Sequence, residues 1–161
     1  ESVVRNLARA PWPYTADDAR SFANQPQDMR LPHFFVTLPT SSGPAELIGC
    51  IGLAEMEGEV ELGYWFARAH WGRGFATEAA RAVLSLARTL GHRRIVAGHF
   101  VDNPASGRVL RKAGFRPTGK LRQRFSLARG ETVDSVEHRI ELSDPCNCDG
   151  DADAARVMRA A

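Results

Sequence analysis

Glu61–Ala79 reads ELGYWFARAHWGRGFATEA, and this stretch of the 161-residue chain decides its fold. Alternate residues at its start are apolar or aromatic, which predicts a strand: Val60, Leu62, Tyr64 and Phe66. From Phe75 the apolar residues recur every three or four positions, which predicts a helix to Leu90. The segment is therefore a strand, a glycine-rich turn and a helix.

Small residues stand at alternate positions of this turn: Gly72, Gly74 and Ala76. Small residues let the backbone approach a ligand closely and adopt turn conformations. Successive N–H groups of such a turn, together with the positive N-terminal end of the next helix, form a cradle for an anion. The turn therefore predicts a pyrophosphate site. The alternative is a tight strand-to-helix turn with no ligand.

Three kinds of phosphate loop compete for this pattern. A Walker loop needs Gly-Lys-Ser/Thr, which is absent, and a dinucleotide fingerprint needs a glycine where Thr77 stands. The third is the coenzyme A loop Gln/Arg-x-x-Gly-x-Gly/Ala of the GNAT superfamily, which this turn resembles. Gly74 and Ala76 occupy its last two fixed positions, and Trp71 replaces the usual Gln or Arg. The block Trp-Gly-x-Gly-x-Ala-Thr-Glu-Ala is similar to the RimJ/RimL branch.

A second block strengthens the resemblance, because Asn103-Pro-Ala-Ser106 followed by Val109–Phe115 is similar to the next characteristic segment of that family. The resemblance extends from Glu1 to Leu142 and implies an α+β fold. In that fold a splayed mixed sheet has helices on both faces, and it opens between the 60–66 and 94–101 strands. The first strand of such domains is expected to precede this sequence. We expect the domain to span residues 1–144 and a polar tail to span residues 145–161.

The remaining helices and strands are predicted from hydrophobic periodicity and from the Gly, Pro and capping residues that bound them. We expect a helix from Thr15, its N-cap, to Asn24, and a short helix over 104–113 between Asn103 as N-cap and Gly114. Strands are expected over 33–38, 47–57, 94–101, 121–127 and 132–142.

The resemblance implies acetyl-CoA as cosubstrate and assigns its contacts. Backbone N–H groups would bind the pyrophosphate at Gly72, Arg73, Gly74, Phe75 and Ala76. Phe66 and Ala67 would pair through their backbone with the pantetheine arm, as a peptide adds to a strand edge. Asn103 has two open interpretations, as helix N-cap or as a cofactor contact.

Acetyl transfer to an amine needs an acceptor for the amine proton. Glu61 is our candidate base, because it alternates off the apolar face of the strand beside the loop. Ser106 is the candidate group that protonates or hydrogen-bonds the leaving thiolate, as the resemblance implies. Phe125 lies where related enzymes can carry a Glu, and it cannot accept a proton.

The predicted function is direct transfer of acetyl from acetyl-CoA to a primary amine. The RimJ/RimL resemblance favours a protein or peptide N-terminus. A small-molecule amine acceptor, and a non-catalytic acyl-CoA-binding or sensing module, are the alternatives. Both a monomer and a homodimer stay open.

Composition narrows the class further. Hydrophobic residues make up 43% and charged residues 25%, as in ordinary globular domains, and the net charge of +2 does not imply nucleic acid. The sequence contains no run of about 18 apolar residues, so no membrane span is predicted. Three sparse cysteines are typical of a reducing compartment, so we expect a cytoplasmic protein. The Cys146–Asp153 segment lacks the glycine and glutamate of a calcium loop, and we expect no metal there.

Overall fold

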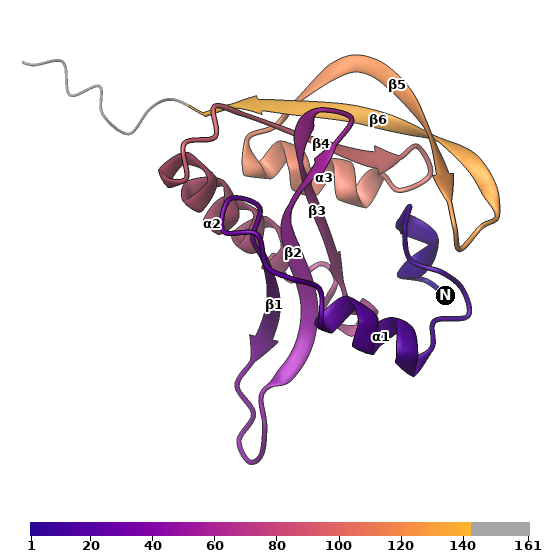
Figure 1. The fold of residues 1–161 in the computed structure, drawn as a ribbon, viewed down its shortest axis with the longest axis vertical. Helices are drawn as coiled ribbons and strands as arrows, with labels where there is room; N and C mark the ends of the chain where they lie inside the picture. The colour runs from indigo at the N-terminus through magenta and orange to yellow at the C-terminus, as the bar shows by residue number, and fades with distance from the viewer. Residues whose placement is uncertain (143–161) are drawn as a thin grey trace, which may run out of the picture.

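A six-stranded mixed sheet in the order β1-β2-β3-β4-β6-β5 organises the chain (Figure 1), in a computed structural model that describes residues 1–142. The elements in chain order are η1 (Val4–Asn6), α1 (Ala16–Ala23), β1 (His33–Leu38), β2 (Glu46–Met56), β3 (Glu59–Phe66), η2 (Arg68–His70), α2 (Phe75–Thr89), β4 (Arg94–Phe100), α3 (Pro104–Ala113), β5 (Arg116–Ser126) and β6 (Glu131–Glu141). The expected α+β architecture is confirmed.

The sheet splits between β3 and β4. These strands run parallel, and a single register pair, Glu61 with Val96, joins them. On either side the pairing is continuous: β2 follows β3 from Glu59 to Phe66, and β6 follows β4 along its whole length. Beyond Glu61 the two strands therefore diverge toward their C-terminal ends, at the place where the sequence predicts the opening.

The hydrophobic core lies between the sheet and the helices α2 and α3. Ile51, Leu62 and Ile95 point from the sheet into this layer, and Ala87 and Leu110 meet them from the helices. Full burial of one such aliphatic side chain contributes about 1.5–3 kcal/mol to the free energy of folding.

Helix α1 lies over the opposite face, because Phe22 contacts the rings of His33 and Phe35. Phe35 is paired with Cys50, a neighbour of the core residue Ile51, and neighbouring residues of a strand point to opposite faces. Helices thus cover both faces. The expected N-cap of α1 is confirmed by a capping box between Thr15 and Asp18.

The N-terminal segment is held against the β5–β6 turn (Figure 1). Leu127 donates its backbone N–H to the carbonyl of Ala8 at 2.9 Å, and the Ser126 hydroxyl donates to the carbonyl of Leu7 at 3.1 Å. Arg129 donates to the carbonyl of Arg5 at 2.7 Å. These hydrogen bonds join residues 5–8 to residues 126–129, which are far apart in the sequence.

Strand β5 begins at Arg116, five positions before the predicted start at Leu121. Pro117 and Gly119 interrupt the alternation there, and the register with β6 shifts between Pro117 and Leu121. The other strands match the expected ranges to within one residue at either end. The predicted tail, residues 145–161, lies outside the described residues. No helix within residues 1–142 is long and apolar enough to cross a membrane.

Candidate active site

Two helix N-termini lie at the open end of the split. Helix α2 follows β3 through the glycine turn, and α3 follows β4 through Val101–Asn103. Because β3 and β4 are parallel, both helices begin at the same edge of the sheet. The N-terminal end of a helix carries partial positive charge and free N–H groups, so this edge favours an anion.

The glycine turn has the backbone conformation of an anion cradle. Gly72 has φ 76° and Gly74 φ 92°, a region that L-residues with side chains rarely adopt. A Cβ at either position would meet no atom within 4 Å, so backbone conformation rather than crowding requires glycine, and the turn is open to a ligand. Gly74 is the N-cap of α2 and supplies no side-chain cap. The first-turn N–H groups of Phe75 and Ala76 have no partner within the helix.

Arg73 is held over the start of α2. Its guanidinium lies 5.0 Å from the centre of the Phe75 ring, and its Nη1 lies 3.2 Å from Nδ1 of His70. Nε2 of His70 lies 3.1 Å from a carboxylate oxygen of Glu46. When Arg73 donates to Nδ1, the neutral imidazole carries its proton on Nε2 and donates it to Glu46. These contacts use one N–H group of Arg73 and place its charge beside the turn.

Trp71 contacts the last residue of β3. Its indole Nε1 donates to the Phe66 carbonyl at 2.7 Å, while Ala67 donates its N–H to Ile48 on β2 at 2.8 Å. Because backbone groups of successive residues in a strand point in opposite directions, Phe66 turns its own N–H and C=O into the split. Trp71 therefore occupies an acceptor that faces the opening. The pantetheine pairing of Phe66 and Ala67 stays a prediction.

A pair of hydroxyl groups spans the split. The Tyr64 hydroxyl, from β3, lies 2.7 Å from the Ser106 hydroxyl in the first turn of α3. Burial raises the pKa of Tyr64 to about 12, although its hydrogen bond with Ser106 opposes the rise. Tyr64 is thus a neutral phenol at ordinary pH. Asn103 accepts from the Ser106 backbone N–H at 3.3 Å, which confirms its role as the N-cap of α3.

Glu61 lies on the opposite sheet face and is already paired. Its Oε2 accepts from Nη2 of Arg124 on β5 at 2.7 Å, and the two side chains are 15% and 18% exposed. Glu61 is therefore a largely buried carboxylate beside the split, held in an ion pair that the sequence analysis did not anticipate.

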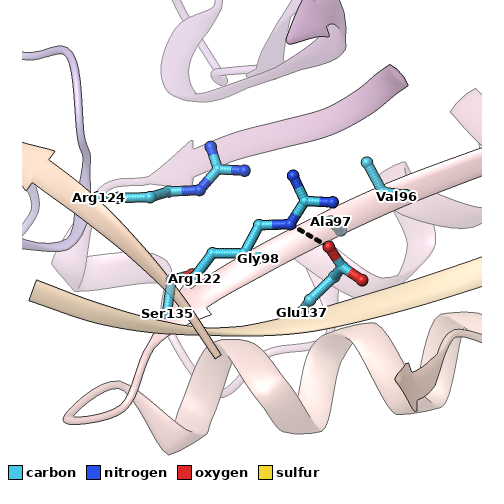
Figure 2. A pocket seen from close by; sticks show the side chains of 7 residues that line it. All are labelled: Val96, Ala97, Gly98, Arg122, Arg124, Ser135 and Glu137. Carbon is cyan, nitrogen blue, oxygen red and sulfur yellow. Dashed lines mark hydrogen bonds and ion pairs between the residues drawn. The ribbon is translucent and has the colours of Figure 1, made fainter. Parts of the chain in front are cut away.

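Arg122, two positions along β5, is surrounded by carboxylates. It donates to Glu57 at 2.6 Å, to Glu59 at 2.9 Å, and to Glu137 on β6 (Figure 2). Burial acts to raise the pKa of Glu137, but hydrogen bonds from Thr118 and Arg122 outweigh it and hold that pKa below its ordinary value. Glu137 is therefore ionised at neutral pH.

A small hollow opens beside these arginines (Figure 2). It is lined by Val96, Ala97, Gly98, Arg122, Arg124, Ser135 and Glu137. Its volume is about 10 Å³, the room that one water needs. The hollow lies on the Glu61 side of the sheet, because Glu61 and Val96 are register partners and Gly98 is two residues further along β4.

The sequence analysis missed Tyr64 and Arg124 as site residues. Tyr64 alternates with apolar residues and was assigned to the core face, where it does lie; its hydroxyl partner Ser106 comes from a distant segment. Arg122 and Arg124 alternate with Leu121 and Phe125, a visible sign that they share a face. Phe125 itself is 54% exposed and brings no acid to the site.

Comparison with known proteins identifies the class. A solved acetyltransferase (GNAT family) from Bacillus anthracis superposes with a TM-score of 0.70 and 27% identity, over 87% of this chain and 81% of that one. The spermidine N-acetyltransferase from Vibrio cholerae, solved with CoA and spermine, gives a TM-score of 0.62 at 25% identity, over 80% of this chain and 77% of that one. The splayed sheet is thus the architecture of known acetyltransferases.

Sequence relatives agree. YoaA of Bacillus subtilis (strain 168), named an uncharacterized N-acetyltransferase, is 46% identical over 99 residues, 59% of this chain and 55% of that protein. The ribosomal-protein-serine acetyltransferase of Escherichia coli (strain K12) is 37% identical over 82 residues, 48% of this chain and 46% of that protein. The chain spans about half the length of the curated relatives it matches. The acetyltransferase (GNAT) domain model matches residues 1–116, and the chain belongs to that family.

Proposed function

We propose that this protein transfers acetyl directly from acetyl-CoA to a primary amine. One observation supports this most strongly: the split after Glu61 has an anion cradle at its mouth, a hydroxyl pair on one face and a carboxylate on the other. Such an opening lets a thioester lie between a proton donor and a proton acceptor.

The cradle is proposed to hold the cofactor pyrophosphate. The open turn at Gly72 and Gly74 leaves its N–H groups accessible, and the start of α2 adds its positive end. Arg73 lies close enough to the same turn to add charge. The pantetheine arm would then follow β3 into the split, toward which the Phe66 N–H points, while the Phe66 C=O accepts from Trp71. Asn103 supports the site by fixing the first turn of α3 that carries Ser106.

Bound acetyl-CoA supplies an activated acetyl group, and the protein handles two protons. The amine nitrogen forms a bond to the acetyl carbon while the bond from that carbon to sulfur breaks. Glu61, directly or through water, takes the proton that the amine loses. Ser106 supplies a proton to the departing sulfur and regains one from the hydrogen-bonded phenol of Tyr64, which solvent reprotonates as Glu61 releases its own proton. The products are an amide and a free thiol.

Two acceptor classes compete. The RimJ/RimL-like turn and the relative named as a ribosomal-protein-serine acetyltransferase support a protein or peptide N-terminus. The structural neighbour solved with spermine supports a small-molecule amine. In both classes the acceptor approaches from the Glu61 face, because the hydroxyl pair occupies the other.

A non-catalytic acyl-CoA-binding module is the second candidate. The ion pair of Glu61 with Arg124 is the observation that favours it, because Arg124 already occupies a carboxylate oxygen that would accept the amine proton. Acetyl-CoA consumption with a panel of amines and N-terminal peptides, alongside calorimetric titration with CoA, separates the two. Binding and turnover support the enzyme. Binding with no turnover on any amine supports the module, and no binding overturns both. Size-exclusion chromatography with light scattering would settle the monomer and homodimer alternatives.

A further inference from the structure

One residue that lines the hollow on the Glu61 face, Gly98, has no side chain. Gly98 lies on β4 opposite Glu137, and a Cβ placed on it would come within 2.8 Å of the Ser135 hydroxyl. The same Cβ would lie 4.0 Å from Nε of Arg124. The absence of a side chain at Gly98 therefore gives the Ser135 hydroxyl its place beside the hollow, next to Arg124.

The two arginines at this hollow differ in how many carboxylates surround them. Arg122 donates to three, from Glu57, Glu59 and Glu137. Within residues 1–142, Arg124 has one hydrogen-bonded carboxylate, Glu61, reached through Nη2 alone. A guanidinium carries five N–H donors in a planar fork, so Arg124 retains donors suited to a further carboxylate.

An acceptor amine that reaches Glu61 competes with Arg124 for the same carboxylate. A simple amine would displace the Nη2 contact and leave the donors of Arg124 without that acceptor in a largely buried place, which is costly. An acceptor that carries its own carboxylate next to the amine supplies a new partner, because that carboxylate binds Arg124 while the ammonium binds Glu61.

We propose that the acceptor is a compact zwitterion with a carboxylate beside the primary amine, as in a free α-amino acid, bound by Arg124 and Glu61 above Gly98. This assignment rests on the proposed acetyl transfer and narrows its acceptor. The hollow now holds about the volume of one water, so the ligand enters by spreading the Glu61–Arg124 pair. A protein N-terminus presents a neutral amide where the carboxylate would be, and it gains nothing from Arg124.

The test compares three forms of each acceptor in the full chain with acetyl-CoA: a panel of L-amino acids, their primary amides, and the corresponding decarboxylated amines. We expect kcat/KM to favour the free acid over its amide by about tenfold or more, because a charge-assisted hydrogen bond is lost in the amide. Calorimetric titration of the same compounds into CoA-saturated protein measures binding independently of turnover.

Three variants locate the effect. Arg124→Lys keeps the charge beside Glu61 but loses the planar fork, so the preference for the free acid should fall several-fold. Gly98→Ala places a methyl group 2.8 Å from the Ser135 hydroxyl, which must move into the hollow, and no charge changes; KM for the amino acid should rise while CoA affinity stays unchanged. Arg116→Lys is the matched control, because Arg116 is an exposed arginine of the same strand, and the preference should persist.

The outcomes separate this assignment from the proposed function. Turnover of amides and peptides as fast as of free acids would overturn the zwitterion and favour a protein N-terminus, with acetyl transfer intact. Binding of amino acids that depends on Arg124, without turnover, would support the site and overturn the enzyme. Turnover that favours the acid equally in wild type and Arg124→Lys would remove Arg124 from recognition.

Discussion

The hydroxyl oxygens of Tyr64 and Ser106 lie 2.7 Å apart, across the split that separates β3 from β4. One belongs to a strand and the other to the first turn of α3, and Asn103 fixes that turn by capping it. A phenol whose pKa is raised to about 12 keeps its proton at neutral pH and can donate it to the serine oxygen. In the proposed reaction the pair would provide a hydrogen-bond path to the departing thiolate.

Ser106→Ala should lower kcat by about 10²–10⁴-fold, the usual worth of general acid help, with little change in CoA affinity. A thiolate develops only as the reaction proceeds, so ground-state binding does not depend on the serine proton. Tyr64→Phe should show the same pattern to a smaller extent, since it acts through Ser106. Single-turnover kinetics and calorimetry measure the two effects separately. Wild-type kcat in Ser106→Ala would remove the pair from the mechanism.

Gly74→Asp should abolish CoA binding, because it adds a negative charge and a side chain at the proposed cradle. Gly43→Asp is the matched control: Gly43 also has positive φ and an open Cβ position, but it lies in the β1–β2 loop. Both substitutions carry the strain of a left-handed residue, about 1–2 kcal/mol, so urea unfolding should show similar losses of stability. Calorimetric titration with CoA should distinguish them. Equal CoA affinity in the two variants would contradict the assignment of the turn.

Glu61→Gln should slow acetyl transfer at neutral pH and recover part of the rate at high pH. The glutamine keeps the shape but accepts no proton, and α-amino groups, with a pKa near 8, become neutral without help above that pH. Arg124 would lose its carboxylate, so circular dichroism must first establish that the variant is folded. CoA affinity should barely change. If the pH–rate profiles of wild type and variant run parallel at equal rates, bulk water takes the proton and Glu61 is structural.

His138 should make the fold less stable in mild acid. Its side chain is 1% exposed, its Nε2 has no hydrogen-bond partner within the described residues, and its ring lies 5.2 Å from that of His99. Burial, then repulsion from His99 and Arg111, against an opposing hydrogen bond to Val136, lowers its pKa in the folded state. The unfolded chain therefore binds the proton more readily, and stability falls as pH drops below about 6.5.

The slope for one such proton is at most about 1.4 kcal/mol per pH unit. Urea unfolding of wild type and His138→Leu between pH 7.5 and 5 measures the difference. The wild type should lose more stability than the variant across that range. If the difference in unfolding free energy between wild type and variant does not change with pH, the pKa of His138 is the same in the folded and unfolded states.

Sequence pattern predicted the elements that depend on local rules. Periodicity located the helix from Phe75, and capping chemistry located the starts at Thr15 and Asn103. The start of β5 could not be predicted, because Pro117 and Gly119 are untypical of a strand. The strand forms there through its pairing with β6. The glycine turn could be predicted because its positive φ angles require glycine, and glycines are visible in the sequence.

The geometry of the candidate site was harder to predict from the sequence. Glu61 was identified from strand alternation, but its partner Arg124 is 63 residues away and is brought there only by the order of strands in the sheet. Likewise, nothing in the local sequence distinguishes Tyr64 from an ordinary core tyrosine, because its contact with Ser106 depends on where α3 begins. Contacts between distant elements determine which polar groups meet, and a single sequence carries little record of them.

The single register pair between Glu61 and Val96 divides the sheet into two halves, β1-β2-β3 and β4-β6-β5. Carboxylates of one half meet guanidinium groups of the other: Glu59 with Arg122, and Glu61 with Arg124. On this face the halves are connected mainly by side-chain charge rather than by a backbone ladder. The shared core fixes the halves from the other face, so the side chains proposed to recognise the acceptor are also those that hold the two halves together on this face.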